Sequence, residues 1–133
     1  MPTQTSLVTG VDFVTLPTRD WEAAKEFYGT VLGLPFGKQW GEMPAGEFEA
    51  GNLTLAVMQS DAFGLEFKPH TAPVAFQVDD VEAARAELES RGVTFLRDTL
   101  DSGVCHQAFF EDPDGNMLDI HHRYAPKGVK PGD

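Results

Sequence analysis

The sequence predicts one α+β domain built from two copies of a β-α-β-β-β unit. Two observations carry this prediction. A short acidic helix start occurs twice, as residues 20–25 (DWEAAK) and residues 80–85 (DVEAAR), a constant shift of 80 − 20 = 60 residues. Each occurrence follows a short apolar segment and precedes further strand-like segments. A chain of 133 residues has the usual length of a single domain and can bury a core.

Both repeated segments are expected to open a helix. Asp20 and Asp80 are suited to the N-cap position, where a carboxylate accepts a hydrogen bond from a free backbone N–H group. Apolar residues then recur at helical spacing in both copies. Gly33 and Gly92 are expected to end the helices, because glycine adopts the left-handed conformation at little steric cost.

Strands are expected on both sides of each helix. In the first copy they cover residues 13–16, 48–50 and 53–58, and in the second residues 74–78, 93–96, 105–111 and 117–122. Gly115 would supply the positive φ of the turn between the last two strands. We divide the chain into module one (about 10–59), a linker (60–72), module two (about 73–124) and a mobile tail (125–133).

The amino-acid composition restricts which kinds of partner the protein is expected to bind. The chain has 21 acidic and 10 basic residues, and its net charge of −11 disfavours binding to nucleic acids and anionic membranes. The acidity serves solubility or attracts a cationic ligand. Cys105 is the only cysteine, which excludes an intrachain disulfide. No secretory signal and no apolar run of about 18 residues is visible, so we expect a soluble, cytoplasmic protein without a membrane partner.

Three motifs together resemble the vicinal-oxygen-chelate superfamily, which includes glyoxalase, bleomycin-resistance and dioxygenase proteins. Residues 20–34 are similar to the family opening D-x-x-x-A-x-x-F-Y-x-x-x-L-G-L, and residues 110–116 are similar to the closing turn F-x-D-P-D-G-N. The third is the acidic helix start repeated at Asp80. The resemblance covers about residues 11–124 and implies two tandem modules that form a cup-shaped mixed sheet, commonly in a homodimer.

The resemblance also implies where a divalent metal would bind inside the cup. The matching positions are Phe13 and Pro73 in the first strands, a residue near Leu55 in module one, and Asp119 in module two. Of these side chains, only that of Asp119 can coordinate a metal. We therefore expect no metal site at the family positions, and no cofactor.

Polar side chains on the last strand offer an alternative chemistry. Asp119 and His121 share one face of a regular strand and could act as an acid–base pair, or form a structural ion pair. His106 on the preceding strand could join them in a two-His, one-carboxylate site for Fe, Zn, Ni or Mn. Cys105 is expected to be a small buried residue rather than a nucleophile.

Apolar side chains suggest a ligand pocket. We expect Phe13, Trp40, Phe48, Leu55 and Phe110 to line it together with His106, although each aromatic ring could equally serve ordinary core packing. Trp40 lies in a glycine- and glutamate-rich loop, where an exposed ring would suit stacking of a cationic aromatic ligand.

Three functions remain open at this point. The first is a metal-free protein that sequesters an apolar or cationic small molecule, as the bleomycin-resistance branch does. The second is an enzyme of lyase, isomerase or dioxygenase type that uses His121 and Asp119, with or without a divalent metal. The third is a small interaction module whose cup is filled by its own side chains.

Overall fold

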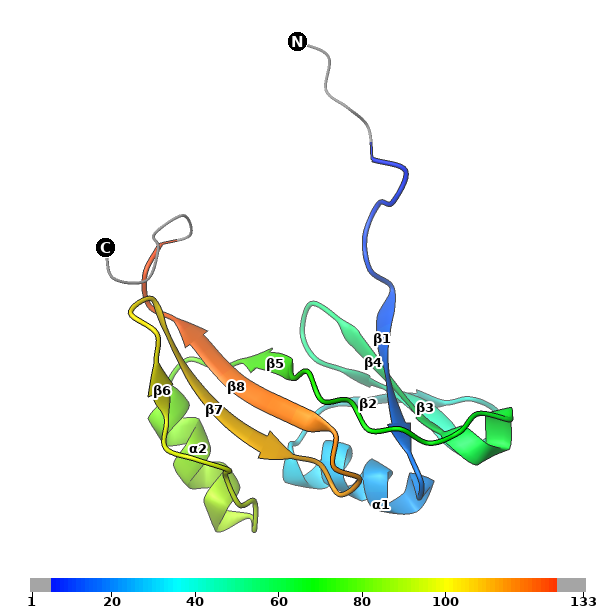
Figure 1. The fold of residues 1–133 in the computed structure, drawn as a ribbon. Helices are drawn as coiled ribbons and strands as arrows, with labels where there is room; N and C mark the ends of the chain where they lie inside the picture. Colours follow the sequence, from blue (N-terminus) through cyan, green and yellow to red (C-terminus); the bar gives the residue numbers. More distant parts are fainter. Residues whose placement is uncertain (1–5, 127–133) are drawn as a thin grey trace.

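A computed structural model describes residues 6–126 of the chain. It contains two four-stranded sheets, with strand orders β1-β4-β3-β2 and β5-β8-β7-β6 (Figure 1). In both sheets the first strand of the module pairs in parallel with the last, and the remaining ladders are antiparallel. The predicted α+β fold of two β-α-β-β-β modules is confirmed.

The first module contains β1 (Phe13–Thr18), α1 (Trp21–Glu26), the π-helical turn η1 (Phe27–Val31), β2 (Phe36–Gln39), β3 (Ala45–Glu49) and β4 (Thr54–Gln59). The second contains β5 (Val74–Gln77), α2 (Val81–Ser90), β6 (Leu100–Asp101), β7 (Cys105–Glu111) and β8 (Met117–Arg123). A 3₁₀ turn, η2 (Ser60–Phe63), begins the connection between them. No helix in residues 6–126 is long and apolar enough to cross a bilayer.

The helix ends agree with the sequence prediction. The carboxylates of Asp20 and Asp80 accept the backbone N–H groups three residues later, at 3.2 and 3.0 Å. After the helices, Gly33 and Gly92 have φ angles of 73° and 95°, which is the left-handed conformation expected of them.

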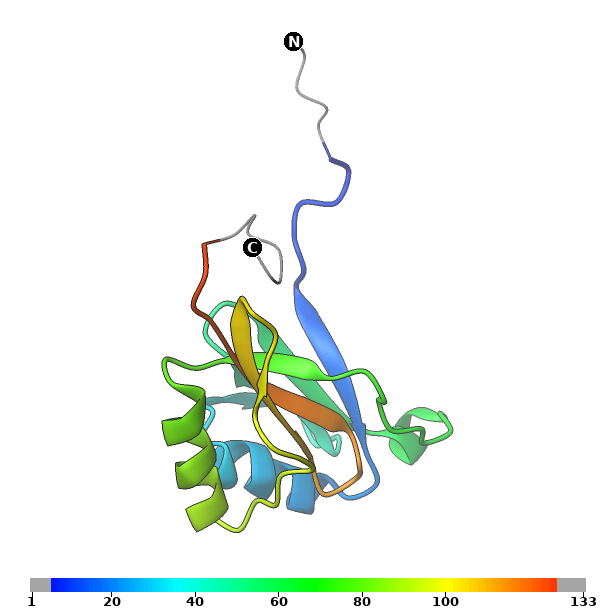
Figure 2. The same cartoon turned by 60° about the vertical axis from the view of Figure 1, so that its left-hand side comes forward.

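The two helices lie side by side on the same side of both sheets (Figures 1 and 2). The guanidinium group of Arg91, directly after α2, donates a hydrogen bond of 2.9 Å to the carbonyl of Val31 at the end of η1. One apolar core therefore spans both modules, and it includes Leu16, Trp21, Tyr28, Phe48, Leu55, Val57, Val81, Leu88, Phe95, Phe110, Leu118 and Ile120.

One predicted strand is absent, and two strands of the structure were not predicted. Residues 93–96 form no strand, because only an isolated bridge joins Phe95 to Phe110. The edge strands β2 and β6 were missed, and both are short and exposed, so burial imposes little alternation on their sequence. The tail predicted from residue 125 lies mostly outside the described residues.

A buried polar cluster, which we call the polar lock, joins the β7–β8 turn to module one. The side chain of Asp112 accepts hydrogen bonds from the Tyr28 hydroxyl, at 2.5 Å, and from the Asn116 amide, at 2.7 Å. Asn116 also donates to the carbonyl of Pro17 at 2.8 Å, and Asp114 accepts the hydroxyl of Thr18. The family-like turn at residues 112–116 therefore holds the two modules together.

Candidate functional site

The candidate site lies on the face of the second sheet turned away from the helices. On β7 and β8, alternate residues such as Ala108, Phe110, Leu118 and Ile120 point into the core. The residues between them point the other way and form what we call the open face, which consists of Ala75, Gln77, Gln107, Phe109, Met117, Asp119 and His121. Across its centre, Asp119 lies between Ala75 and Phe109, and His121 lies between Gln77 and Gln107.

Asp119 is the chemically exceptional group on this face. Its side chain is only 2% exposed, and its Oδ1 atom has no hydrogen-bond partner in the described chain. Burial raises the pKa of its carboxyl group to about 6, because the charged form loses water, and a hydrogen bond from the backbone of Ala108 offsets only part of this effect. A ligand that donates a hydrogen bond or brings a positive charge would satisfy the free oxygen.

The raised pKa of Asp119 predicts a pH-dependent stability. Between the ordinary pKa of 3.8 and about 6, the carboxyl group ionises in the unfolded chain before it does so in the folded one. The free energy of unfolding of the native chain therefore falls by about 1–3 kcal/mol as the pH rises from 4 to 6. Asp119→Asn has no carboxyl group at this position and does not undergo this loss. The free energy of unfolding of the variant, relative to that of the native chain, should therefore be higher at pH 7 than at pH 4. Urea unfolding at each pH measures the difference.

The matched control is Asp98→Asn, since Asp98 is exposed and makes none of the contacts of the polar lock. Its stability relative to the native chain is expected to stay within about 0.5 kcal/mol over the same pH range. Equal pH profiles for the Asp119→Asn variant and the native chain would contradict the raised pKa.

The structure does not assemble the metal set proposed from sequence. His121 pairs across the sheet with Gln107, whereas His106 pairs with His122 and therefore points to the opposite face. The Nε2 atom of His106 lies 3.4 Å from a carboxylate oxygen of Asp101, and its ring centroid lies 4.9 Å from that of Tyr124, with the two rings tilted by 43°. Within residues 6–126, no group of three or more His, Cys, Asp and Glu side chains could hold a metal ion.

Three of the expected pocket residues are part of the core, and one of them, Leu55, also borders the cleft described below. Phe48, Leu55 and Phe110 are fully buried because they occupy the helix-facing positions of their strands. Both faces of these strands carry apolar residues, so the sequence does not distinguish a core position from a pocket position.

Two other aromatic residues predicted for the pocket remain accessible. Phe13 is 50% exposed at the start of β1. Trp40 is half-buried, packs edge-to-face on Phe63 at 6.2 Å, and donates from Nε1 to a Glu47 carboxylate oxygen at 2.8 Å. Glu47, on β3 of the first sheet, thus orients the indole ring, and Asp119 belongs to the second sheet.

A cleft of about 630 Å³ borders the open face. One wall is the β3–β4 turn, with Asn52 and Leu53, and the other is β5 together with His121 at the end of β8. The sequence offered no direct signal for this cleft, since its walls come from different modules and neither wall forms a motif.

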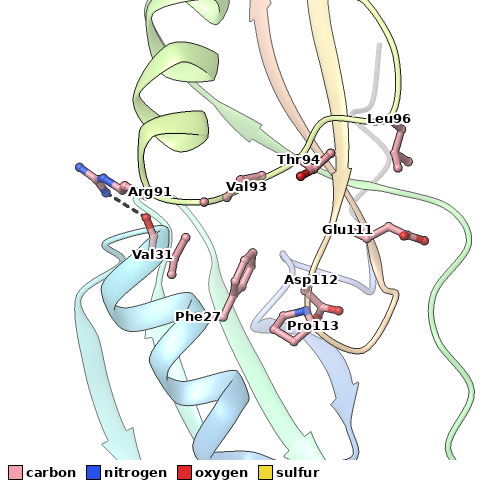
Figure 3. Close-up of a pocket in the computed structure, with 10 residues that line it drawn as sticks. Phe27, Val31, Arg91, Val93, Thr94, Leu96, Glu111, Asp112 and Pro113 are labelled. Atoms are coloured by element: carbon pink, nitrogen blue, oxygen red, sulfur yellow. Dashed lines mark hydrogen bonds between the residues drawn. The ribbon is translucent and has the colours of Figure 1, made fainter.

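A second cavity, of about 440 Å³, lies where the two helices end (Figure 3). Phe27 and Val31 approach it from η1, and Glu111 and Pro113 approach it from the end of β7. The hydrogen bond from the Arg91 guanidinium group to the Val31 carbonyl lies at one side of this cavity. The buried carboxylate that borders this cavity, Asp112, already accepts the hydrogen bonds of the polar lock. We therefore assign no ligand to the cavity.

Comparison with known proteins agrees with this geometry. Residues 10–120 match the model of the glyoxalase/bleomycin resistance protein/dioxygenase superfamily. The chain belongs to this superfamily. Residue by residue, it is 29% identical over 132 residues to a lactoylglutathione lyase of Schizosaccharomyces pombe. The aligned part is 77% of this chain but 43% of that protein, so the chain spans less than half of its curated relative.

Solved superfamily structures have the same fold. A glyoxalase/bleomycin resistance protein/dioxygenase from Nocardioides matches 97% of this chain and 91% of its own, with a TM-score of 0.73 and 26% identity. TnmS3, an antibiotic binding protein from Streptomyces sp. CB03234, matches 90% of this chain and 99% of its own, with a TM-score of 0.74 and 24% identity.

The superfamily's metal positions can now be placed on the sheets. The pair Ala75–Asp119 in the second sheet corresponds, by the 60-residue shift of the first strand, to the pair Thr15–Ala56 in the first. The last-strand position of module one is therefore Ala56 rather than Leu55. Because Phe13, Pro73 and Ala56 offer no ligand atom on their side chains, the residues present do not fit the superfamily's divalent metal.

Proposed function

We propose that this superfamily member binds a small organic cation, or a neutral ligand with an N–H or O–H donor, on the open face of the second sheet, without a metal. The observation that carries the proposal is Asp119, a buried carboxyl group whose Oδ1 atom has no partner in the described chain. Gln77, Gln107 and His121 surround it with further polar groups that can orient a ligand.

Other features support sequestration rather than turnover. The net charge of −11 raises the local concentration of cations around the protein. The fold is shared with an antibiotic binding protein, so it is compatible with storage of an intact small molecule. A single cysteine, which is buried, is consistent with action in the cytoplasm.

The proposal is tested with a pair of fluorescent probes of opposite charge. Ethidium, a planar aromatic cation, is expected to bind, and the anionic dye anilinonaphthalene sulfonate is not. Asp119→Asn should weaken ethidium binding about tenfold or more, because it removes the charge that the cation neutralises. Binding by the native chain should also weaken below pH 6, where Asp119 takes up a proton. Fluorescence titration at pH 5 and pH 8 measures both effects.

Glu26→Gln serves as the control variant, because Glu26 is an exposed carboxylate on the helix side of the molecule. It should bind ethidium as the native chain does. Equal loss in both variants would show attraction by overall charge alone, and undiminished binding by Asp119→Asn would overturn the assignment of the site.

A second candidate, acid–base catalysis, is favoured by the pKa of Asp119, since a group that titrates near 6 can exchange protons at neutral pH. The name of the fission-yeast relative suggests lactoylglutathione as the substrate to test. With Fe, Zn, Ni or Mn added in turn, we expect no lyase activity above background. Turnover that disappears in both Asp119→Asn and His121→Ala would replace the binding proposal with an enzymatic one.

A further inference from the structure

A third cavity, which we call the seam pocket, lies between the two modules on the helix side of the sheets and has a volume of about 480 Å³. Module two contributes α2 and the helix-facing side of β5 and β8, and module one contributes the connection from η1 to β2 and the β3–β4 turn. Most of the lining is apolar and includes Leu34, Ala50, Phe76, Val78, Leu88 and Ile120. The open face lies on the other side of β5, so this pocket is separate from the surroundings of Asp119.

The apolar side chains around the seam pocket belong to the core but are not fully covered. Phe76 pairs with the buried Ile120 across the β5–β8 ladder, so its ring shares the helix-facing side of the sheet. Leu34, Ala50 and Val78 also pack against the core, yet each of them, like that ring, is only partly buried. Protein interiors normally contain few voids larger than a water molecule. A molecule that covers this remaining apolar surface would be held by the hydrophobic effect.

The charged residues that border the seam pocket are exposed and already have hydrogen-bond partners. The guanidinium group of Arg91 donates to a carboxylate oxygen of Glu87 at 3.0 Å and to the carbonyl of Val31 at 2.9 Å. The carboxylate of Glu49 accepts the Thr54 hydroxyl at 2.9 Å. An ion pair with such an exposed carboxylate contributes little, whereas burying a charge against the apolar lining is costly. The pocket therefore favours an uncharged molecule.

The modules are not joined by hydrogen bonds across the seam pocket. Within residues 6–126, no hydrogen bond connects β5 or α2 to the β3–β4 turn. The hydrogen bonds that hold the modules together are those of the polar lock and the one from Arg91 to Val31. Because apolar contacts have no fixed direction, Leu34 and Phe76 can adjust to a ligand without the loss of a hydrogen bond.

We propose that the seam pocket is a second ligand site, which takes an uncharged, apolar small molecule. Its volume of about 480 Å³ is within the range of about 300–1,000 Å³ that is usual for small-molecule pockets, which often lie where two structural units meet. Its occupant differs in chemistry from the one proposed for the open face, where the Oδ1 atom of Asp119 requires a cation or a hydrogen-bond donor. This inference does not depend on the ligand proposed for the open face.

Binding of the uncharged fluorescent dye N-phenyl-1-naphthylamine to the full chain tests the site. The fluorescence of this dye rises in apolar surroundings, and the native chain is expected to bind it saturably. Anilinonaphthalene sulfonate is the same ring system with an added sulfonate group, and it should bind about tenfold more weakly or worse, because its charge gains no partner in the pocket. An absence of saturable binding of the uncharged dye, or equal affinity for both dyes, would overturn the proposal.

Two variants fill the seam pocket from opposite walls. Ala84→Trp adds an indole ring on α2 and Ala50→Trp adds one before the β3–β4 turn, and each should weaken binding of the uncharged dye about tenfold or more. Ala86→Trp is the matched control, because Ala86 is exposed on the same helix and does not line the pocket, and it should bind the dye as the native chain does. Circular dichroism checks the fold of each variant, and one folded filling variant is sufficient. Equal affinity in all three variants, or equal loss in all three, would overturn the assignment.

A last variant separates this site from the open face. Asp119→Asn should bind N-phenyl-1-naphthylamine as the native chain does, and ethidium should not displace the dye. Loss of dye binding in Asp119→Asn would place the dye on the open face and overturn the second site. Failure of ethidium to bind would instead contradict the open-face proposal alone, so the two proposals can fail separately.

Discussion

Replacing Asp112 with alanine is expected to lower the free energy of unfolding by about 3–5 kcal/mol, because the change leaves several buried donors without an acceptor. The carboxylate accepts hydrogen bonds from the Tyr28 hydroxyl, the Asn116 amide and the backbone N–H groups of Asp114 and Asn116. Urea denaturation followed by tryptophan fluorescence measures the loss.

Two further variants test how much of this loss comes from a single hydrogen bond and how much from removal of any carboxylate. Tyr28→Phe removes one hydroxyl group from the polar lock and should cost about 1–2 kcal/mol. Asp98→Ala removes an exposed carboxylate and should change stability by less than about 0.5 kcal/mol. If Asp112→Ala were no more harmful than Asp98→Ala, the polar lock would not hold the modules together.

Phe48→Ala is expected to cost about 3–5 kcal/mol, since it empties a large volume in a core that cannot collapse to fill it. The ring of Phe48 is fully buried, and its centroid lies 5.2 Å from that of Phe36, 6.0 Å from Tyr28 and 6.3 Å from Trp21. Calorimetry and urea unfolding should both register the loss.

The control is the same substitution at Phe13, whose ring is 50% exposed. Phe13→Ala should alter the stability of a single chain by no more than about 1 kcal/mol. Similar losses at both positions would contradict the role of Phe48 in the core.

The sequence predicted the fold well because the fold depends on local signals that occur twice. The N-cap residues Asp20 and Asp80 and the glycines at 33 and 92 act within one turn of chain, so their effect is visible without tertiary structure. Strands that are short, exposed and at an edge, such as β6, lack the alternation that burial imposes. Such segments form strands because they pair with a neighbouring strand, as β6 does with β7.

The site was harder to predict, since it depends on which face of each strand meets the helices. Asp119 and His121 were placed together correctly by the two-residue period of β8. His106 was misplaced because the register between β7 and β8 is set by the turn, and this register puts Gln107 opposite His121. Gln77 and Gln107 were missed for the same reason. Only the paired strands bring them beside the histidine.

The duplicated halves of this chain are no longer interchangeable. The turn that closes the second module accepts hydrogen bonds from Thr18 and Tyr28 of the first, while the corresponding β3–β4 turn lines an open cleft. The two closing turns of the repeat therefore have different surroundings, one bonded to the other module and one beside a cleft.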